Sequence, residues 1–277
     1  MSFTVGGVLK DAVERLTTSA GAVLIAALTV VGIIQTAAGQ EIVRGVLERF
    51  RAELQNPEVR DQLTAEQLEM AETEIDAAMA ELPLALGLSP GVAAAVWFLG
   101  LVLMLVVVVI AIDAFGHERD TIDEFVTDRL AWKTLNLFLG WIVFGILFVI
   151  GLVLFVIPGL LVAIFLLFFA AAIVIDDKSF FSAFSSSASV VRHNFLGTLG
   201  IIVVSIVVGI AIALVGSVVG GILPAIGAAI VGDLLAAVSQ AFALALVARA
   251  YVEATADESV ADAADADVGS ETQADAS

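Results

Sequence analysis

The chain has 277 residues, of which 60% are hydrophobic and 15% are charged, and its mean hydropathy is +1.06. These values exclude an ordinary soluble domain, which buries its apolar residues only in its own core. The absence of cysteine excludes disulfides, thiolate metal sites and a cysteine nucleophile, and for a net charge of −18 we expect no nucleic-acid partner.

The N-terminal stretch 3–18 has apolar residues at helical spacing, with charged residues opposite. This pattern predicts an amphipathic helix in the membrane interface, followed by a first span over 20–38. A second interpretation is a signal peptide, because the apolar run is short and ends in the small residues Thr36, Ala37 and Ala38. Acidic residues in a long, periodic N-terminal region make the signal peptide the weaker interpretation.

The segment 41–88 is water-soluble in character, and eleven acidic residues lie between Gly39 and Pro90. A capping box of Thr64 and Gln67 opens its second helix, and Asn56 and Pro57 end its first. We therefore expect an external helical hairpin whose apolar faces pack on each other or on the bilayer surface. The alternative is a partner-binding or sensor module. The apolar stripe of the first helix comprises Ile42, Val43, Val46, Leu47, Phe50 and Leu54.

A second span is expected over 92–112, followed by a polar segment that ends near Lys133. Thr121 and Glu124 form a second capping box in this segment and predict an in-plane helix. The acidic residues here show no regular ligand spacing, so we expect a solvated acidic turn and no metal site. The residues considered as metal ligands are Asp113, His117, Glu118, Asp120 and Asp123.

The third and fourth spans, 134–156 and 159–175, are long apolar runs separated only by Ile157, Pro158 and Gly159. Each is long enough to cross the roughly 30 Å hydrocarbon core of a bilayer. We expect a tight helical turn at Pro158 and Gly159. A further amphipathic helix is expected over 179–195. Its serine face could contact lipid phosphates together with Arg192 and His193, but packing against a neighbouring helix is the favoured interpretation.

The fifth and sixth spans are expected over 196–215 and 226–247. Gly216 and Gly220 have the spacing of a helix-packing motif. Asp233 is the one acidic residue well inside an apolar run, and with Gln240 it forms a candidate intramembrane polar site. A structural role near the interface is the favoured interpretation of Asp233. An integral membrane domain would then occupy 1–252, and 253–277 would be a disordered acidic tail.

The distribution of Lys and Arg predicts the orientation of the chain. The four Arg residues of the segment 39–91 all lie within one long acid-rich loop. The remaining eight Lys and Arg residues all lie in segments expected on the same side of the membrane as the N-terminus. The positive-inside rule then favours cytoplasmic termini and an external loop 39–91 in a multi-pass protein of the cell membrane. The acidic composition, with nine Arg and three Lys, suits a halophilic protein.

One stretch resembles a known family. Ile157, Pro158 and Gly159 open a span, Ile173 to Asp176 close it, and Asn194 precedes the next span. These residues resemble an uncharacterised haloarchaeal membrane protein family related to the membrane domain that accompanies some glycerophosphodiester phosphodiesterases. The family-like motif residues are Pro158, Gly159, Asp176 and Asn194. The resemblance implies a membrane location and fold but no reaction, because the catalytic domain of the fused enzymes is missing.

The expected fold class is all-α: a polytopic membrane bundle of about six transmembrane helices, amphipathic in-plane helices and an external hairpin. No catalytic residues and no cofactor are expected. The favoured hypothesis is a non-enzymatic structural or partner-organising protein in contact with the lipid bilayer, with a protein partner or a homo-oligomer. The alternative is a small transporter or channel that uses Asp233 and Gln240. A membrane-embedded enzyme that uses Ser189 and His193 as a catalytic pair is the weakest hypothesis, because nothing supplies a carboxylate to orient the histidine.

Overall fold

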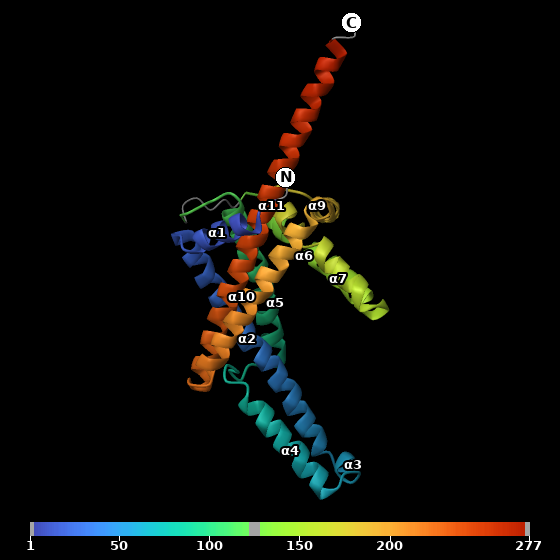
Figure 1. Ribbon diagram of the computed structural model, residues 1–277. Helices are drawn as coiled ribbons and strands as arrows, with labels where there is room; N and C mark the ends of the chain where they lie inside the picture. Colours follow the sequence, from blue (N-terminus) through green and yellow to red (C-terminus); the bar gives the residue numbers. More distant parts are fainter. Residues whose placement is uncertain (1–2, 122–127, 275–277) are drawn as a thin grey trace. The chain divides into compact units, whose positions relative to one another are not determined.

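The computed structural model describes residues 3–121 and 128–274 (Figure 1). Every regular element in these two ranges is a helix, which confirms the all-α prediction. Within them, six helical segments are long and apolar enough to cross a membrane. They are Ser19–Leu54, Pro90–Gly116, Leu130–Leu154, Val156–Ile175, Phe195–Gly220 and Ala225–Ala256.

The chain divides into two compact units. Unit 1 comprises Met1–Ile25, Leu105–Ile210 and Ser239–Ser277, and unit 2 comprises Ala26–Met104 and Ala211–Val238. Four long helices contribute to both units: α2 (Ser19–Leu54), α5 (Pro90–Gly116), α10 (Phe195–Gly220) and α11 (Ala225–Ala274). Unit 1 also contains α1 (Val5–Leu16), α6 (Leu130–Leu154), α7 (Val156–Phe165), α8 (Phe169–Ile175) and α9 (Phe180–His193). Unit 2 also contains α3 (Pro57–Arg60) and α4 (Ala65–Ala80).

Helices α1 (Val5–Leu16) and α9 (Phe180–His193) each bury one face in unit 1. Val8 and Ala12 are buried on α1, and Phe3 before it lies against Gly197 of α10, where an added Cβ would be 2.9 Å from the ring. Helix α9 buries Ala183 and Val190 in the same way. The in-plane helix expected from Thr121 and Glu124 lies outside the described residues.

The turn between the third and fourth spans differs from the prediction. Helix α6 (Leu130–Leu154) ends before Phe155, the only residue between it and α7 (Val156–Phe165). Pro158 and Gly159 therefore lie in the first turn of α7 rather than in the connection. Proline is tolerated there because the first N–H groups of a helix have no partner within the helix. Gly159 permits the close approach of α6, since an added Cβ would lie 2.7 Å from Leu152.

The fourth span is also not one continuous helix. Helix α7 ends at Phe165, and α8 (Phe169–Ile175) starts after a short break. The Ser187 hydroxyl of α9 donates to the Phe165 carbonyl at 2.8 Å and accepts from the Phe168 N–H at 3.0 Å. Because an unpaired backbone group in an apolar span is costly, this buried serine stabilises the break.

In unit 2, α2 continues without interruption through the expected end of the first span. The sequence predicts a separate helix after Gly39, but a single interior glycine costs a helix only about 1 kcal/mol. The helix ends before Asn56, whose side chain caps the short α3 (Pro57–Arg60). Helix α4 (Ala65–Ala80) then returns, and both hydrogen bonds of the predicted capping box between Thr64 and Gln67 are present. The hairpin predicted over 41–88 is thus an extension of the span.

Helix α11 continues past the last span to Ala274. A helix therefore stands where the sequence analysis predicts a disordered tail. Alanine, which is abundant in this tail, has the highest helix propensity, and a helix already formed can be extended without a new nucleation step. Charge and low hydropathy predict a disordered tail here because neither property reports the extension of a helix that has already formed.

Candidate functional site

One end of unit 1 contains a network of buried and half-buried ion pairs. Arg249 of α11 lies at its centre, with a side chain that is 8% exposed. Its guanidinium is 3.2 Å from Asp11 Oδ2 of α1 and 2.8 Å from Glu118 Oε1, just after α5. Arg15 of α1 contacts the other oxygen of Glu118 at 3.3 Å and Asp120 at 2.7 Å. These pairs fasten α1 to α5 and α11.

A second cluster surrounds Asp113, which is buried near the C-terminal end of α5. Arg119 donates to its Oδ2 at 2.9 Å, and Lys133 Nζ of α6 lies 3.8 Å from its Oδ1. Lys133 is also 3.6 Å from Asp177, which follows α8. The cluster therefore joins α5, α6 and the end of α8, and a buried carboxylate with charged partners avoids most of the cost of burial.

The acidic turn expected at 113–123 is thus largely engaged in ion pairs. Asp113 pairs with Arg119, whereas Glu118 and Asp120 pair with Arg15, and Glu118 also pairs with Arg249. The ring of His117 lies 3.4 Å from Asp113 Oδ1, on the same helical face. Asp123 lies outside the described residues. In the described part of the chain, no group of three acidic or imidazole side chains could hold a metal ion.

Asp176, one of the family-like motif residues, belongs to a third cluster. The Tyr251 hydroxyl of α11 donates to its Oδ2 at 2.5 Å, and Lys178 Nζ donates to the same oxygen at 2.7 Å. Lys178 also donates to Ser186 of α9 at 2.8 Å. Burial lowers the pKa of Lys178, but the hydrogen bond with Asp176, the charge of Asp176 and the contact with Tyr251 together raise the pKa above its ordinary value. Lys178 therefore remains a cation that holds α8, α9 and α11 together.

Asn194, another motif residue, has a local structural role. It is buried between α9 and α10, and its side chain donates to the Val190 carbonyl at 3.3 Å. Its own carbonyl accepts from the Thr198 hydroxyl at 2.9 Å. The four motif residues are therefore not brought to one point: Pro158 and Gly159 shape the α6–α7 connection, whereas Asp176 and Asn194 lie at helix ends.

The candidate intramembrane residue Asp233 faces α2 within unit 2. The Thr36 hydroxyl donates to Asp233 Oδ1 at 2.8 Å. The second oxygen, Oδ2, is buried and has no hydrogen-bond partner among the described residues. Gln240 lies two turns further along α11, in the part of this helix that belongs to unit 1. The two candidate residues therefore belong to different units, and Asp233 pairs with Thr36 in unit 2.

Gly216 and Gly220 of α10 face α11 in unit 2. A Cβ added at Gly216 would lie 3.3 Å from Leu235 Cδ1, which is tighter than an ordinary contact. At Gly220 the nearest atom would be Ala228 Cβ at 3.9 Å. The absence of a side chain therefore matters more at Gly216 than at Gly220.

A clamp of three α2 side chains holds the return of the hairpin in unit 2. Glu41 is 1% exposed, and its Oε2 accepts from the backbone N–H groups of Leu86 and Gly87 at 2.7 and 2.8 Å. Arg44 pairs with the other Glu41 oxygen at 2.8 Å, and Gln40 accepts from Leu84 N–H at 2.7 Å. Gly87 has φ of +79°, a conformation that glycine adopts without strain.

The hairpin carries an apolar stripe that the structure leaves uncovered. Leu54, at the end of the stripe predicted from the sequence, is buried. Val43, Val46 and Phe50 are instead 48%, 60% and 57% exposed. Their spacing of three and four residues places them on one face of α2. We call these three residues the hairpin stripe.

The clamp and the contacts of Ser187 were not predicted from the sequence. Glu41 looks like one of many acidic residues in a soluble segment. Ser187 belongs to the stretch 157–195 that resembles the known family, but the resemblance does not indicate its partners. No local pattern shows what either residue binds, because the backbone groups lie 45 and about 20 residues away in the chain.

Comparisons of the chain with curated proteins and with solved structures found no match. The profile of one protein family matches residues 3–254, which include five of the six apolar segments, nearly all of the sixth, and the three clusters of unit 1. This chain belongs to that family, which is described as Domain of unknown function (DUF7847).

Proposed function

We propose that this protein is a non-enzymatic membrane protein that holds a partner protein at the hairpin of unit 2. The observation that supports the proposal is the hairpin stripe, Val43, Val46 and Phe50. These three large apolar side chains lie on one face of α2, beyond the apolar part of the span. Burying each side chain fully in an interface would contribute about 1.5 to 3 kcal/mol. Soluble hairpins rarely leave such a surface uncovered without a use.

The hairpin is suited to presenting this surface in one orientation. Helix α2 is continuous from the span into the stripe, and Glu41 binds the returning backbone close to the base of the hairpin. At the other end, Arg51 of α2 pairs with Asp76 of α4. A preorganised surface loses less conformational entropy when it binds a partner.

The charge of the hairpin favours a partner with basic residues around an apolar contact. Between Gly39 and Pro90 there are eleven acidic residues and four arginines. A second copy of the same surface would bring like charges together, whereas a basic surface would be attracted. We therefore propose a different protein, rather than a second copy of this chain, as the occupant of the stripe.

The three clusters of unit 1 support a role without chemistry. Asp113, Glu118 and Asp176 each accept from a cation that lies on a neighbouring element or segment. A general base or nucleophile would instead be oriented toward a substrate position. The polar side chains at this end of the bundle thus hold helices together.

Photocrosslinking in intact cells tests the proposal. A photoreactive amino acid is introduced at Val46, at Phe50 or at Glu48, the last of which lies on the opposite face of the same helix. We expect one and the same protein to be captured from positions 46 and 50 but not from 48, and Val43→Asp to abolish that capture. Capture of a second copy of this chain, equal capture from position 48, or labelling of lipid alone would contradict the proposal.

Asp233 supports a second candidate function, a small transporter or channel. Asp233 Oδ2 is buried and has no hydrogen-bond partner in the described part of the chain, as a proton or cation site in a span requires. Thr36 supplies a second oxygen close by, at 2.8 Å from Asp233 Oδ1. Gln240 would be a second polar position on the same helix.

Flux measurements in proteoliposomes separate this candidate from the first. If the protein conducts protons or monovalent cations, a dye-based assay should show flux that Asp233→Asn abolishes and the control Glu48→Gln leaves unchanged. If the wild-type chain shows no flux above that of empty vesicles, Asp233 has a structural role only.

A further inference from the structure

The cations of unit 1 fall into two groups. Eight of the twelve Lys and Arg residues lie in this unit, and six of them have a carboxylate partner. The six are Arg15, Arg119, Arg129, Lys133, Lys178 and Arg249. The remaining two, Lys10 and Arg192, have no carboxylate partner in the described part of the unit.

Lys10 and Arg192 lie on α1 and α9, and both side chains point away from the core. Lys10 is opposite the buried Val8 and Ala12, and Arg192 is opposite the buried Val190. The two helices lie at the same end of unit 1. Arg249 of α11 binds Asp11 of α1, and two residues later Tyr251 contacts Ser186 of α9. Figure 1 shows α1 and α9 on either side of α11 at this end.

The exposed face of α9 combines Arg192 with a row of hydroxyls. Ser182, Ser185 and Ser189 precede Arg192 at helical spacing, opposite the buried face that contains Ser187. The hydroxyls of Ser185 and Ser189 have no hydrogen-bond partner within the described residues. Ser187, by contrast, has two. Ser185 and Ser189 of the predicted hydroxyl face are therefore open, whereas Ser186 of the same face contacts Tyr251 of α11 and Lys178.

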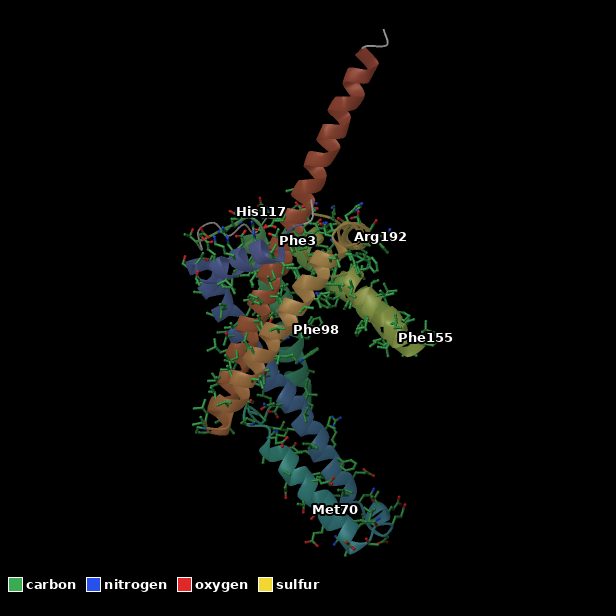
Figure 2. All side chains as sticks on the ribbon, in the orientation of Figure 1. Phe3, Met70, Phe98, His117, Phe155 and Arg192 are labelled. Carbon is green, nitrogen blue, oxygen red and sulfur yellow. The ribbon has the colours of Figure 1, made fainter. Side chains whose placement is uncertain are left out.

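Arg192 lies beside the break between α7 and α8 in the fourth span. Its guanidinium lies 6.0 Å from the ring centre of Phe165, the last residue of α7 in the fourth span. Figure 2 labels Arg192 on α9, next to the hairpin that ends at Phe155. Two apolar side chains flank the row, Phe181 at 72% exposed and Leu196 at 82% exposed. Phe181 is on α9, and Leu196 is near the start of α10. A cation, hydroxyls and an exposed apolar residue on one helix are typical of an element in the membrane interface.

We propose that α9 binds the phosphate headgroup of an anionic phospholipid. Arg192 would contact the phosphate through its guanidinium, which matches two phosphate oxygens, and Ser185 and Ser189 would donate hydrogen bonds. Lys10 of α1 would add a second attraction to the same anionic surface. A free phosphate ion could use the same donors, but it would leave Phe181 and Leu196 in water. The exposed apolar side chains therefore favour a lipid as the ligand.

Native mass spectrometry of the full chain in a non-ionic detergent tests this proposal. The protein is titrated with phosphatidylglycerol or with phosphatidylcholine of the same acyl chains. We expect tighter binding of phosphatidylglycerol, and about a fivefold loss of that affinity in Arg192→Gln, with phosphatidylcholine unchanged. Arg192→Lys should retain part of the affinity, and the double variant Ser185→Ala, Ser189→Ala should lose about twofold.

The matched control is Arg60→Gln in unit 2. Arg60 is exposed and has no carboxylate partner among the described residues. Arg60→Gln changes the net charge by the same amount as Arg192→Gln. It should bind phosphatidylglycerol like the wild-type chain. The proposal is overturned if Arg192→Gln binds like the wild-type chain, if Arg60→Gln loses as much affinity, or if an excess of inorganic phosphate displaces the lipid completely. If Arg192→Gln does not fold, the phosphatidylglycerol affinities of Arg192→Lys and of the double serine variant test the proposal in the same way.

Discussion

The polar end of unit 1 and the hairpin of unit 2 use their exposed and charged residues in opposite ways. In unit 1, Arg249, Lys133 and Lys178 are buried or half-buried, and each bridges different helices. In unit 2, the clamp at Glu41 satisfies the backbone, while Val43, Val46 and Phe50 remain uncovered. Groups that are paired within the fold stabilise it, and groups that are left open are available for recognition. The difference yields separate predictions for stability and for binding.

The largest loss of stability is expected at Arg249. In Arg249→Gln, Asp11 and Glu118 would lose their shared buried cation. Breaking a buried pair costs about 3 to 5 kcal/mol, and the partial exposure of both carboxylates reduces this to about 2 kcal/mol. The measurement is the temperature at which the purified protein loses monodispersity in detergent. An unchanged temperature would show that the network of unit 1 does not hold the helices together.

A loss of about 1 to 3 kcal/mol is expected for Ser187→Ala, because both backbone groups at the break in the fourth span would lose their partner. The control, Ser185→Ala, makes the same change on the exposed face of the same helix and should leave stability unchanged. Equal melting temperatures for Ser187→Ala and Ser185→Ala would contradict the proposal that Ser187 stabilises the break.

Glu41→Gln should cost about 1 to 2 kcal/mol, since a neutral amide accepts the two backbone hydrogen bonds less strongly and loses the pair with Arg44. Limited proteolysis between residues 82 and 89 should become faster. For Glu48→Gln, whose side chain is 55% exposed and 3.7 Å from Arg44, we expect almost no change. Similar cleavage of both variants would show that the clamp does not restrain the loop.

The smallest effect on stability is expected in the hairpin stripe. Val46→Asp changes a side chain that is already in contact with solvent, so the melting temperature should remain within about 1 °C of the wild-type value. Co-purification of the captured partner should nevertheless be lost. A large drop in stability would mean that the stripe packs within the protein, and that unit 2 resembles unit 1 in this respect.

The expected orientation of the chain, with cytoplasmic termini and an external loop 39–91, stays a prediction, as does its halophilic character. The resemblance of 157–195 to a membrane domain that accompanies phosphodiesterases also stays a prediction, because the matching family has no assigned function. The structure adds that Pro158 and Asn194 shape local geometry.

The sequence by itself determined the class of the molecule and the number of its apolar segments. Apolar runs of about 20 residues can satisfy their backbone in a bilayer only as helices, so six runs are enough to predict an all-α bundle. Capping at Thr64 was also predictable, because both partners of the capping box lie within one helical turn.

The tertiary structure alone decided which polar residues are paired and which are open. Glu41 meets Leu86, Ser187 meets Phe165 and Phe168, and Arg249 meets Asp11 only after distant segments have packed together. The same is true of the break between α7 and α8, since a helix can be interrupted in an apolar span when a side chain from elsewhere binds the freed backbone groups. Local periodicity contains no information about such partners, because it reports the faces of a helix and not what lies against them.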